Sequence, residues 1–195
     1  MGKSETAKMF VRLGIPVYDA DAAVHTLYSK GGAAVAPVGA MFAGVVKDGA
    51  IDRQALGGHV LSAPEKLRAL EAIVHPLVAD ARNEWLKAQA AHGAPLVVLD
   101  IPLLYESGGE GNVDAVLVVS AAPDVQRERV LARPGMTPSR FEAIMGQQVS
   151  DEEKRRRADF VVATDRGLEY TFGEIEKIVR ILKNQEGSVW QGEQK

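Results

Sequence analysis

The sequence predicts a three-layer α/β domain built on a parallel β-sheet, and three short apolar runs are the basis of that prediction. These runs lie at residues 96–100, 115–120 and 160–163. Continuous apolar segments of this length are typical of parallel strands whose two faces are covered by helices. Helical patterns alternate with them, at residues 123–132, 138–148 and 171–183. The alternation favours a doubly wound α/β domain.

The first part of the chain fits the same pattern. Residues 4–13 predict a helix because their apolar side chains recur at helical spacing. Gly14 follows, where a left-handed residue is expected to end the helix. Residues 15–21 then predict a short strand that runs into acidic side chains, and residues 22–28 predict another helix.

The middle of the chain, residues 35–91, is predicted to be largely helical with interruptions. The pair Asp48-Gly49 is a turn signal. Pro64 and Pro76 each suit the first turn of a helix. We therefore expect one helix from Pro64 to residue 74 and a second that starts at Pro76.

Composition excludes several classes of protein. Of the 195 residues, 46% are hydrophobic and 25% are charged, as in an ordinary globular protein. The net charge of -3 provides no global basic field for nucleic acid. The absence of cysteine excludes disulfides, cysteine nucleophiles and thiolate metal sites. No apolar run approaches the ~20 residues of a membrane span. We therefore expect a cytoplasmic protein without a nucleic-acid or membrane partner.

Gly2, Lys3 and Ser4 match the last three residues of a phosphate-binding loop, Gly-x-x-x-x-Gly-Lys-[Ser/Thr]. In that loop, backbone N–H groups surround the phosphates, the lysine reaches the β- and γ-phosphates, and the hydroxyl binds Mg²⁺. The tripeptide also opens a predicted helix, whose N-terminus attracts anions. The alternative is a surface helix capped by Ser4 with Lys3 in solvent. The local pattern leaves both interpretations open.

Two groups of acids stand at the ends of predicted strands, where ligands bind in open α/β sheets. Asp19 and Asp21 follow one strand, and either could accept a proton from a hydroxyl nucleophile; we favour Asp21 as the base. Asp21 could instead cap the next helix. Asp100 ends the most apolar strand and is a candidate to support Mg²⁺ or its water shell. The alternative for Asp100 is a structural hydrogen bond.

Arginines are frequent between residues 127 and 157, at positions 127, 129, 133, 140, 155, 156 and 157. Arginine stabilises charge on a transferring phosphoryl group and often lies on a mobile lid. Only Arg133, in an Arg-Pro-Gly turn, is favoured individually; the others are explained more simply as helix faces paired with nearby acids. No two histidines have the spacing of metal ligands. His75 could contact substrate, or it could pack at a helix junction.

Together these segments resemble the dephospho-CoA kinase family over residues 2–183. The resemblance rests on the order of six motifs: Gly2-Lys3-Ser4, residues 13–21, Ile73-Val74-His75-Pro76, residues 99–106, residues 133–137 and residues 153–160. It implies a P-loop kinase that uses ATP and Mg²⁺ to phosphorylate the 3′-hydroxyl of dephospho-CoA. It also implies three parts and a tail: a nucleotide-binding core (1–29, 93–123 and 158–183), a helical CoA-binding insert (30–92), a lid (124–157) and a flexible tail (184–195).

The resemblance also assigns roles by matching position. Lys3 and the backbone of Gly2, Ser4 and Glu5 are expected to hold the phosphates of ATP, with Ser4 on Mg²⁺. Asp21 is the expected base, Asp100 supports metal or substrate, and Arg133 clamps phosphates from the lid. The acceptor pocket is expected to be lined by Asp21, His75, Leu103, Leu104, Tyr105 and Glu106. A monomer is favoured.

Two departures from the family matter. Gln147 stands where the family usually has arginine, so Arg140 or Arg155 would have to substitute. The family also carries about ten more residues before Gly2, which form a strand in the middle of its sheet and the first half of the phosphate loop. We expect that strand to be missing here. The chain is then an active kinase whose start lies upstream, or an inactive remnant that binds CoA-like ligands; another P-loop kinase is a third, weaker alternative.

Overall fold

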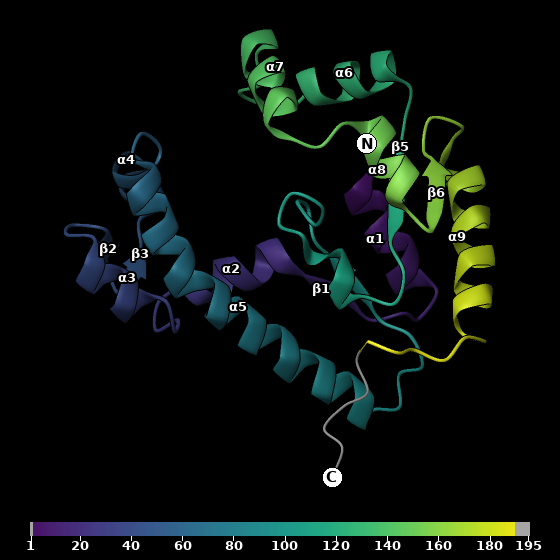
Figure 1. The fold of residues 1–195 in the computed structure, drawn as a ribbon, viewed down its shortest axis with the longest axis horizontal. Helices are drawn as coiled ribbons and strands as arrows, with labels where there is room; N and C mark the ends of the chain where they lie inside the picture. The colour runs from purple at the N-terminus through teal and green to yellow at the C-terminus, as the bar shows by residue number, and fades with distance from the viewer. Residues whose placement is uncertain (1, 190–195) are drawn as a thin grey trace. The chain divides into compact units, whose positions relative to one another are not determined.

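A computed structural model describes residues 2–189 (Figure 1). The chain divides into two units. The first comprises Met1–Val17 and Ala94–Lys195, and the second comprises Tyr18–Gly93. Residues 18–29, which the sequence suggested as part of the core, are grouped with the second unit.

The first unit contains the predicted parallel strands. Strands β5 (Leu117–Ser120) and β6 (Phe160–Ala163) pair in parallel, with Leu117 opposite Phe160 and Ser120 opposite Ala163. Strand β4 (Val98–Asp100) pairs with β1 (Val17–Asp19). Next to this pairing, the Val98 amide donates to the Pro16 carbonyl over 2.9 Å. Among the described residues no ladder joins β4 to β5.

Helices α1 (Lys3–Arg12) and α9 (Leu168–Leu182) lie side by side in the first unit (Figure 1). They enclose an apolar core around Phe10, Val162 and the fully buried Ile175. Gly14 ends the first helix with φ 73°, as predicted. Residues 123–157, where the resemblance implies a lid, form helices α6 (Pro123–Leu131), α7 (Pro138–Gln147) and α8 (Asp151–Arg157). A 3₁₀ turn, η1, covers Gly109–Asn112.

The second unit is helical with one small hairpin. Its helices are α2 (Ala20–Tyr28), α3 (Val35–Met41), α4 (Arg53–Val60) and α5 (Pro64–Ala91). Strands β2 (Val46–Lys47) and β3 (Ala50–Ile51) pair antiparallel. Asp48 and Gly49 join them with φ 51° and 81°, the left-handed conformation that such two-residue turns require. A second apolar core, around Val38, Val45 and Leu56, holds these elements together.

One predicted boundary in this unit is wrong. Pro76 does not start a new helix but lies inside the 28-residue α5. A proline in a helix removes one backbone hydrogen bond and crowds the preceding turn. Buried side chains on both sides of it, Leu70 and Val74 before and Leu86 after, keep the helix continuous because their packing outweighs that local cost.

Two further features complete the fold. No helix among the described residues is long and apolar enough to cross a membrane. Near the end of the chain, the amides of Ser188 and Val189 donate to a carboxylate oxygen of Asp114, the latter over 2.9 Å. The predicted tail continues to residue 195, and its last six residues lie outside the described range.

Candidate functional site

Lys3 and Asp100 meet directly, although 97 positions separate them in the sequence. Lys3 Nζ donates to Asp100 Oδ1 over 2.6 Å. Helix α1 presents the lysine from its first turn, and β4 presents the aspartate from its last residue. The Asp100 side chain is 10% exposed and the Lys3 side chain 41% exposed, so the ammonium group remains accessible to a ligand.

The N-terminus of α1 is the place where the sequence predicts a phosphate-binding turn. Gly2 precedes the helix with φ 93°, a left-handed conformation that a side chain rarely adopts. The Thr6 amide donates to the Gly2 carbonyl over 2.9 Å, which begins the helical hydrogen bonds. The N–H groups of the first turn lack such partners in any helix and attract anions. Ser4 and Glu5 are exposed at this end.

The loop after β6 packs against Gly2. A Cβ atom at Gly2 would lie 3.3 Å from the Thr164 side chain, so glycine permits this close approach. Thr164 is held in turn by Arg129, whose guanidinium donates to its hydroxyl and its carbonyl, each over 3.1 Å. Arg129, on α6, therefore holds the side chain against which Gly2 packs.

In the second unit, Asp19 and Asp21 have different surroundings. Asp19 caps α2: its Oδ1 accepts from the Ala22 amide over 3.0 Å. Asp21 lies in the first turn of the same helix, is exposed, and has no hydrogen-bond or ion-pair partner among the described residues. The sequence offered Asp21 as a possible cap of this helix, but the cap is Asp19. His75 is exposed on α5.

An aromatic pair stands beside these acids. Tyr18 is 7% exposed, and its ring centroid lies 5.4 Å from that of Trp85 on α5, with the planes tilted by 53°. Burial raises the pKa of Tyr18, and the charge of Arg82 partly opposes that effect. The pair fixes the end of β1 against α5 within the second unit.

The segment after β4 divides into exposed and packed residues. Leu103 is exposed, whereas Leu104 and Tyr105 belong to a third apolar cluster with Val116 and Val118. Burial raises the pKa of the Tyr105 hydroxyl, and the guanidinium of Arg157, 4.4 Å from the ring centroid, partly opposes this. Of these side chains, Leu103 is the one that solvent reaches most readily.

Glu106 is engaged by the protein itself. Its Oε1 accepts from Lys154 Nζ over 2.8 Å and from the Val149 amide over 3.0 Å. Burial alone would raise the pKa of this carboxyl, but the hydrogen bonds from Lys154 and Val149 and the lysine charge outweigh it and lower the pKa. Lys154 lies in one of the motifs of the resemblance, but the sequence pattern predicts no role for its side chain.

Two arginines of the lid region have free side chains. Among the described residues, the side chains of Arg133 and Arg155 make no hydrogen bond, ion pair or ring contact, and both are exposed. The other five have partners: Arg127 with Glu142, Arg129 with Thr164, Arg140 with Gly135, Arg156 with Glu153, and Arg157 with Glu110. The residues open to a phosphate are therefore the predicted Arg133 and one of the two suggested substitutes for the missing lid arginine.

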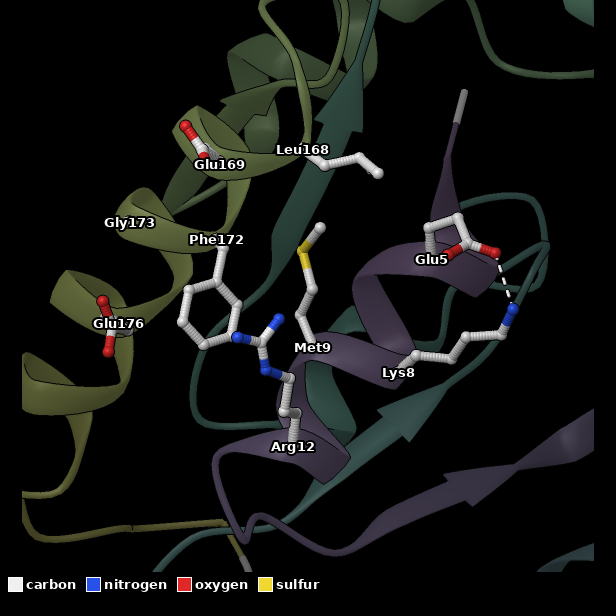
Figure 2. Close-up of a pocket in the computed structure, with 9 residues that line it drawn as sticks. All are labelled: Glu5, Lys8, Met9, Arg12, Leu168, Glu169, Phe172, Gly173 and Glu176. Carbon is white, nitrogen blue, oxygen red and sulfur yellow. Dashed lines mark hydrogen bonds and ion pairs between the residues drawn. The ribbon is translucent and has the colours of Figure 1, made fainter.

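Two cavities lie in the first unit. The larger, about 920 Å³, is lined by Arg155 and Arg156 of α8, Asp165, and the loop that follows β5. The smaller, about 330 Å³, lies between α1 and α9 (Figure 2). Its two cations are already engaged, since Lys8 pairs with Glu5 over 2.6 Å and Arg12 lies 4.4 Å from the Phe172 ring centroid.

Metal ligands are sparse. Within residues 2–189, no three His, Asp or Glu side chains gather closely enough to hold a metal ion. The hydroxyl of Ser4 and the carboxylate of Asp100 are the nearby oxygen donors that the sequence identified.

Three comparisons identify similar proteins. A family model described as dephospho-CoA kinase matches residues 1–169. A protein named dephospho-CoA kinase from Mesorhizobium japonicum is 52% identical over 96% of this chain and 94% of its own length. One of the same name from Rhizobium meliloti is 51% identical over 94% of this chain and 93% of its own length.

Solved structures agree with the fold. TT1252 from Thermus thermophilus is 36% identical, with a TM-score of 0.78 over 92% of this chain and 91% of that one. A dephospho-CoA kinase from Campylobacter jejuni, 24% identical, has a TM-score of 0.69 over 93% of this chain and 92% of its own. The second likeness concerns the fold alone.

Proposed function

We propose a function for this chain on the basis of its family: the chain belongs to the dephospho-CoA kinase family. We infer that it transfers the γ-phosphoryl group of ATP to the 3′-hydroxyl of dephospho-CoA, which gives coenzyme A and ADP. The observation that carries this proposal is the contact of Lys3 with Asp100 at the open N-terminus of α1. It supports a phosphate site with a cation and a strand-end carboxylate side by side.

On the nucleotide side, Lys3 and the first-turn N–H groups of Gly2 to Glu5 would bind the β- and γ-phosphates. Arg133 would approach from the lid, and Arg155 would take the place of the arginine that Gln147 replaces. Both guanidinium groups are unpaired within the described residues. Positive charge placed there neutralises the charge that spreads over the transferring phosphoryl oxygens.

The residues present fit Mg²⁺ bound together with the nucleotide. Ser4 would provide a hydroxyl ligand, and Asp100 would orient its water shell. Mg²⁺ prefers oxygen ligands and usually keeps several waters, so one or two protein donors suffice. When bound, it would neutralise charge on the phosphates.

On the acceptor side, Asp21 would accept the proton of the 3′-hydroxyl. Its carboxylate is exposed and unpaired among the described residues, whereas that of Asp19 is used as a cap. His75 and the segment from Leu103 to Glu106 would contact the acceptor. We place the nucleotide-binding core at residues 1–29, 93–123 and 158–183, the CoA-binding insert at residues 30–92 and the lid at 124–157. We further propose a monomer in the cytoplasm, where ATP is available.

The test is a direct assay of the protein as its native source makes it, with ATP, Mg²⁺ and dephospho-CoA, and with the product identified by mass. We expect ATP-dependent formation of coenzyme A, and a loss of about 10²–10⁴-fold in kcat for Asp21→Asn, the range for general-base catalysis. Asp48→Asn is the matched control, because it removes a carboxylate from a turn whose φ of 51° asparagine tolerates. A chain that binds dephospho-CoA without phosphorylating it would contradict the proposal.

A further inference from the structure

Glu106 connects two segments that are remote in the sequence. It ends the stretch that follows Asp100, and it accepts hydrogen bonds from Val149 and Lys154, 43 and 48 positions later. The Glu106 and Lys154 side chains are 16% and 13% exposed. A pair this shielded from water is weakly screened, and loss of one partner leaves an uncompensated charge. The contact is therefore a specific attachment and not a loose surface ion pair.

The attachment lies where the lid region returns to the core. Helix α7 ends at Gln147, and α8 begins at Asp151. Between them, Gln148 and Ser150 have extended backbone, with ψ 151° and 152°. The Val149 amide in the middle of this connection donates to Glu106. A single carboxylate thus holds both the connection and, through Lys154, the helix that follows.

Helix α8 has further contacts with the same segment. Arg157 lies over the Tyr105 ring, 4.4 Å from its centroid, and forms an ion pair with Glu110. At the other end of the helix, Ser120 of β5 donates to Asp151 over 2.7 Å. Helix α8 is therefore fixed between the residues after β4 and the end of β5.

This placement decides where the free guanidinium of Arg155 points. Arg155 follows Lys154 on α8 and lines the 920 Å³ cavity with the loop after β5. Since α8 is attached through Lys154, a change in the segment after β4 moves α8, and a change in α8 moves that segment. The two ends of the attachment are the ones that the proposed function assigns to the acceptor and to the phosphates.

We propose that Glu106 and Lys154 are positioning residues that couple acceptor binding to closure of the lid. Glu106 acts on α8 through Lys154 and on the connection before it through Val149. This inference rests on the proposed function. Binding of one substrate then favours the arrangement of α8 that the other requires, and the effect is reciprocal.

The first test concerns the free protein and needs no activity. Hydrogen exchange of the Val149 amide is compared among the wild type, Lys154→Met, Lys154→Arg and Glu106→Gln. We expect exchange to rise about 10–100-fold in Glu106→Gln, which removes the charge from the acceptor of the Val149 amide, and in Lys154→Met, which removes the cation that holds this acceptor in place, since a hydrogen bond to a charged group contributes a factor of that order. Lys154→Arg should retain the protection. Lys177→Met is the control, because it breaks an exposed 2.6 Å pair with Glu174 on α9.

The second test measures coupling. Affinity for a non-hydrolysable ATP analogue is determined by calorimetry with and without dephospho-CoA. We expect each substrate to tighten the other by about 5–150-fold in the wild type, the usual range for coupled sites. The factor should fall close to one in Lys154→Met and Glu106→Gln, and return in Lys154→Arg. If Lys154→Met does not fold, Glu106→Gln provides the same comparison.

The outcomes separate the two proposals. A wild type that makes no coenzyme A refutes the proposed function, whereas the exchange result still reports on the attachment. If the wild type makes coenzyme A but its two substrates bind independently, the coupling is refuted and the proposed function is not. The coupling is also refuted if Lys154→Met lowers the melting temperature but keeps the wild-type coupling factor, because the pair is then only structural.

Discussion

At the residue scale, Lys3 and Asp100 have unequal access to solvent, which suits a site that exchanges ligands. The carboxylate is 10% exposed and keeps its place, while the longer lysine is 41% exposed and can turn toward a phosphate. The ammonium group has three donors, so it can bind a phosphate while one donor still contacts Asp100. The contact with Asp100 thus orients the Lys3 side chain in the free protein.

The first prediction concerns this side chain. Lys3→Ala should lower kcat by about 10²–10³-fold, the usual effect of removing one group that stabilises charge in the transition state. The fold should persist, because the side chain is half exposed and packs in no core. Steady-state kinetics and circular dichroism measure both. Lys177→Ala is the control, and near-normal turnover by Lys3→Ala would refute the phosphate role of this residue.

A second residue-scale prediction concerns pH. The folded pKa of Glu106 is lowered from the ordinary value of 4.5, so its contribution to stability is present above that value and is lost as pH falls through the lower, folded pKa. The free energy of unfolding of the wild type should therefore fall more steeply below pH 4.5 than that of Glu106→Gln. Urea denaturation at neutral and acidic pH measures this. Parallel pH profiles for the two proteins would show that Glu106 has no such role.

Some candidate residues could be selected from the sequence, and Lys154 could not, for a physical reason. Lys3, Asp21 and Asp100 stand in local patterns that carry their chemistry, so a motif suffices to select them. Lys154 stands among charged residues that look alike in sequence, and its burial against Glu106 follows from packing across 48 positions. Pairing at that distance depends on tertiary structure, which composition and spacing do not contain.

At the element scale, helix types and order followed from periodicity, whereas some boundaries did not. Helices α1, α6 and α7 lie within a residue of their predicted bounds. Helix α5 passes through Pro76 because side chains on both sides of the proline are buried. Rules based on neighbouring residues account for the hydrogen bond that proline removes, but not for the tertiary packing that compensates for it.

The lid region leads to a prediction about two arginines. Arg133→Ala and Arg155→Ala should each lower kcat by about 10²-fold, since each removes a cation that no group within residues 2–189 neutralises. Arg156→Ala, on the same helix as Arg155, loses only an exposed pair with Glu153 and should keep wild-type rates. Single-turnover kinetics with saturating ATP measures the effect. Equal rates for Arg155→Ala and Arg156→Ala would show that Arg155 does not replace the arginine that the family usually has at position 147.

At the scale of the whole molecule, the chain has a separate apolar core in each unit. One surrounds Ile175 and the other surrounds Val38, and both side chains are fully buried. A third, smaller cluster lies around Tyr105. The sequence indicated the α/β class through its apolar runs, but the grouping of residues 18–29 with the helical unit depends on contacts of α2 with α5.

The two cores lead to a prediction about local stability. Ile175→Ala should destabilise the first unit by about 2–5 kcal/mol, and Val38→Ala should destabilise the second by about 2 kcal/mol. Hydrogen exchange should rise mainly among the amides of the unit that carries the change. Mass spectrometry of peptides from each unit measures this. A uniform rise across both units in either variant would show that the two cores unfold as one.

The aromatic pair in the second unit has a practical consequence. Trp85 lies 5.4 Å from Tyr18, and Tyr18 is followed closely by the candidate base Asp21. Indole emission responds to the polarity and charge of its surroundings, so this tryptophan is an intrinsic fluorophore next to the acceptor side of the proposed reaction. Titration of the unlabelled protein with dephospho-CoA, followed by emission and compared with a Trp85→Phe variant, would make acceptor binding visible in real time without a reporter dye.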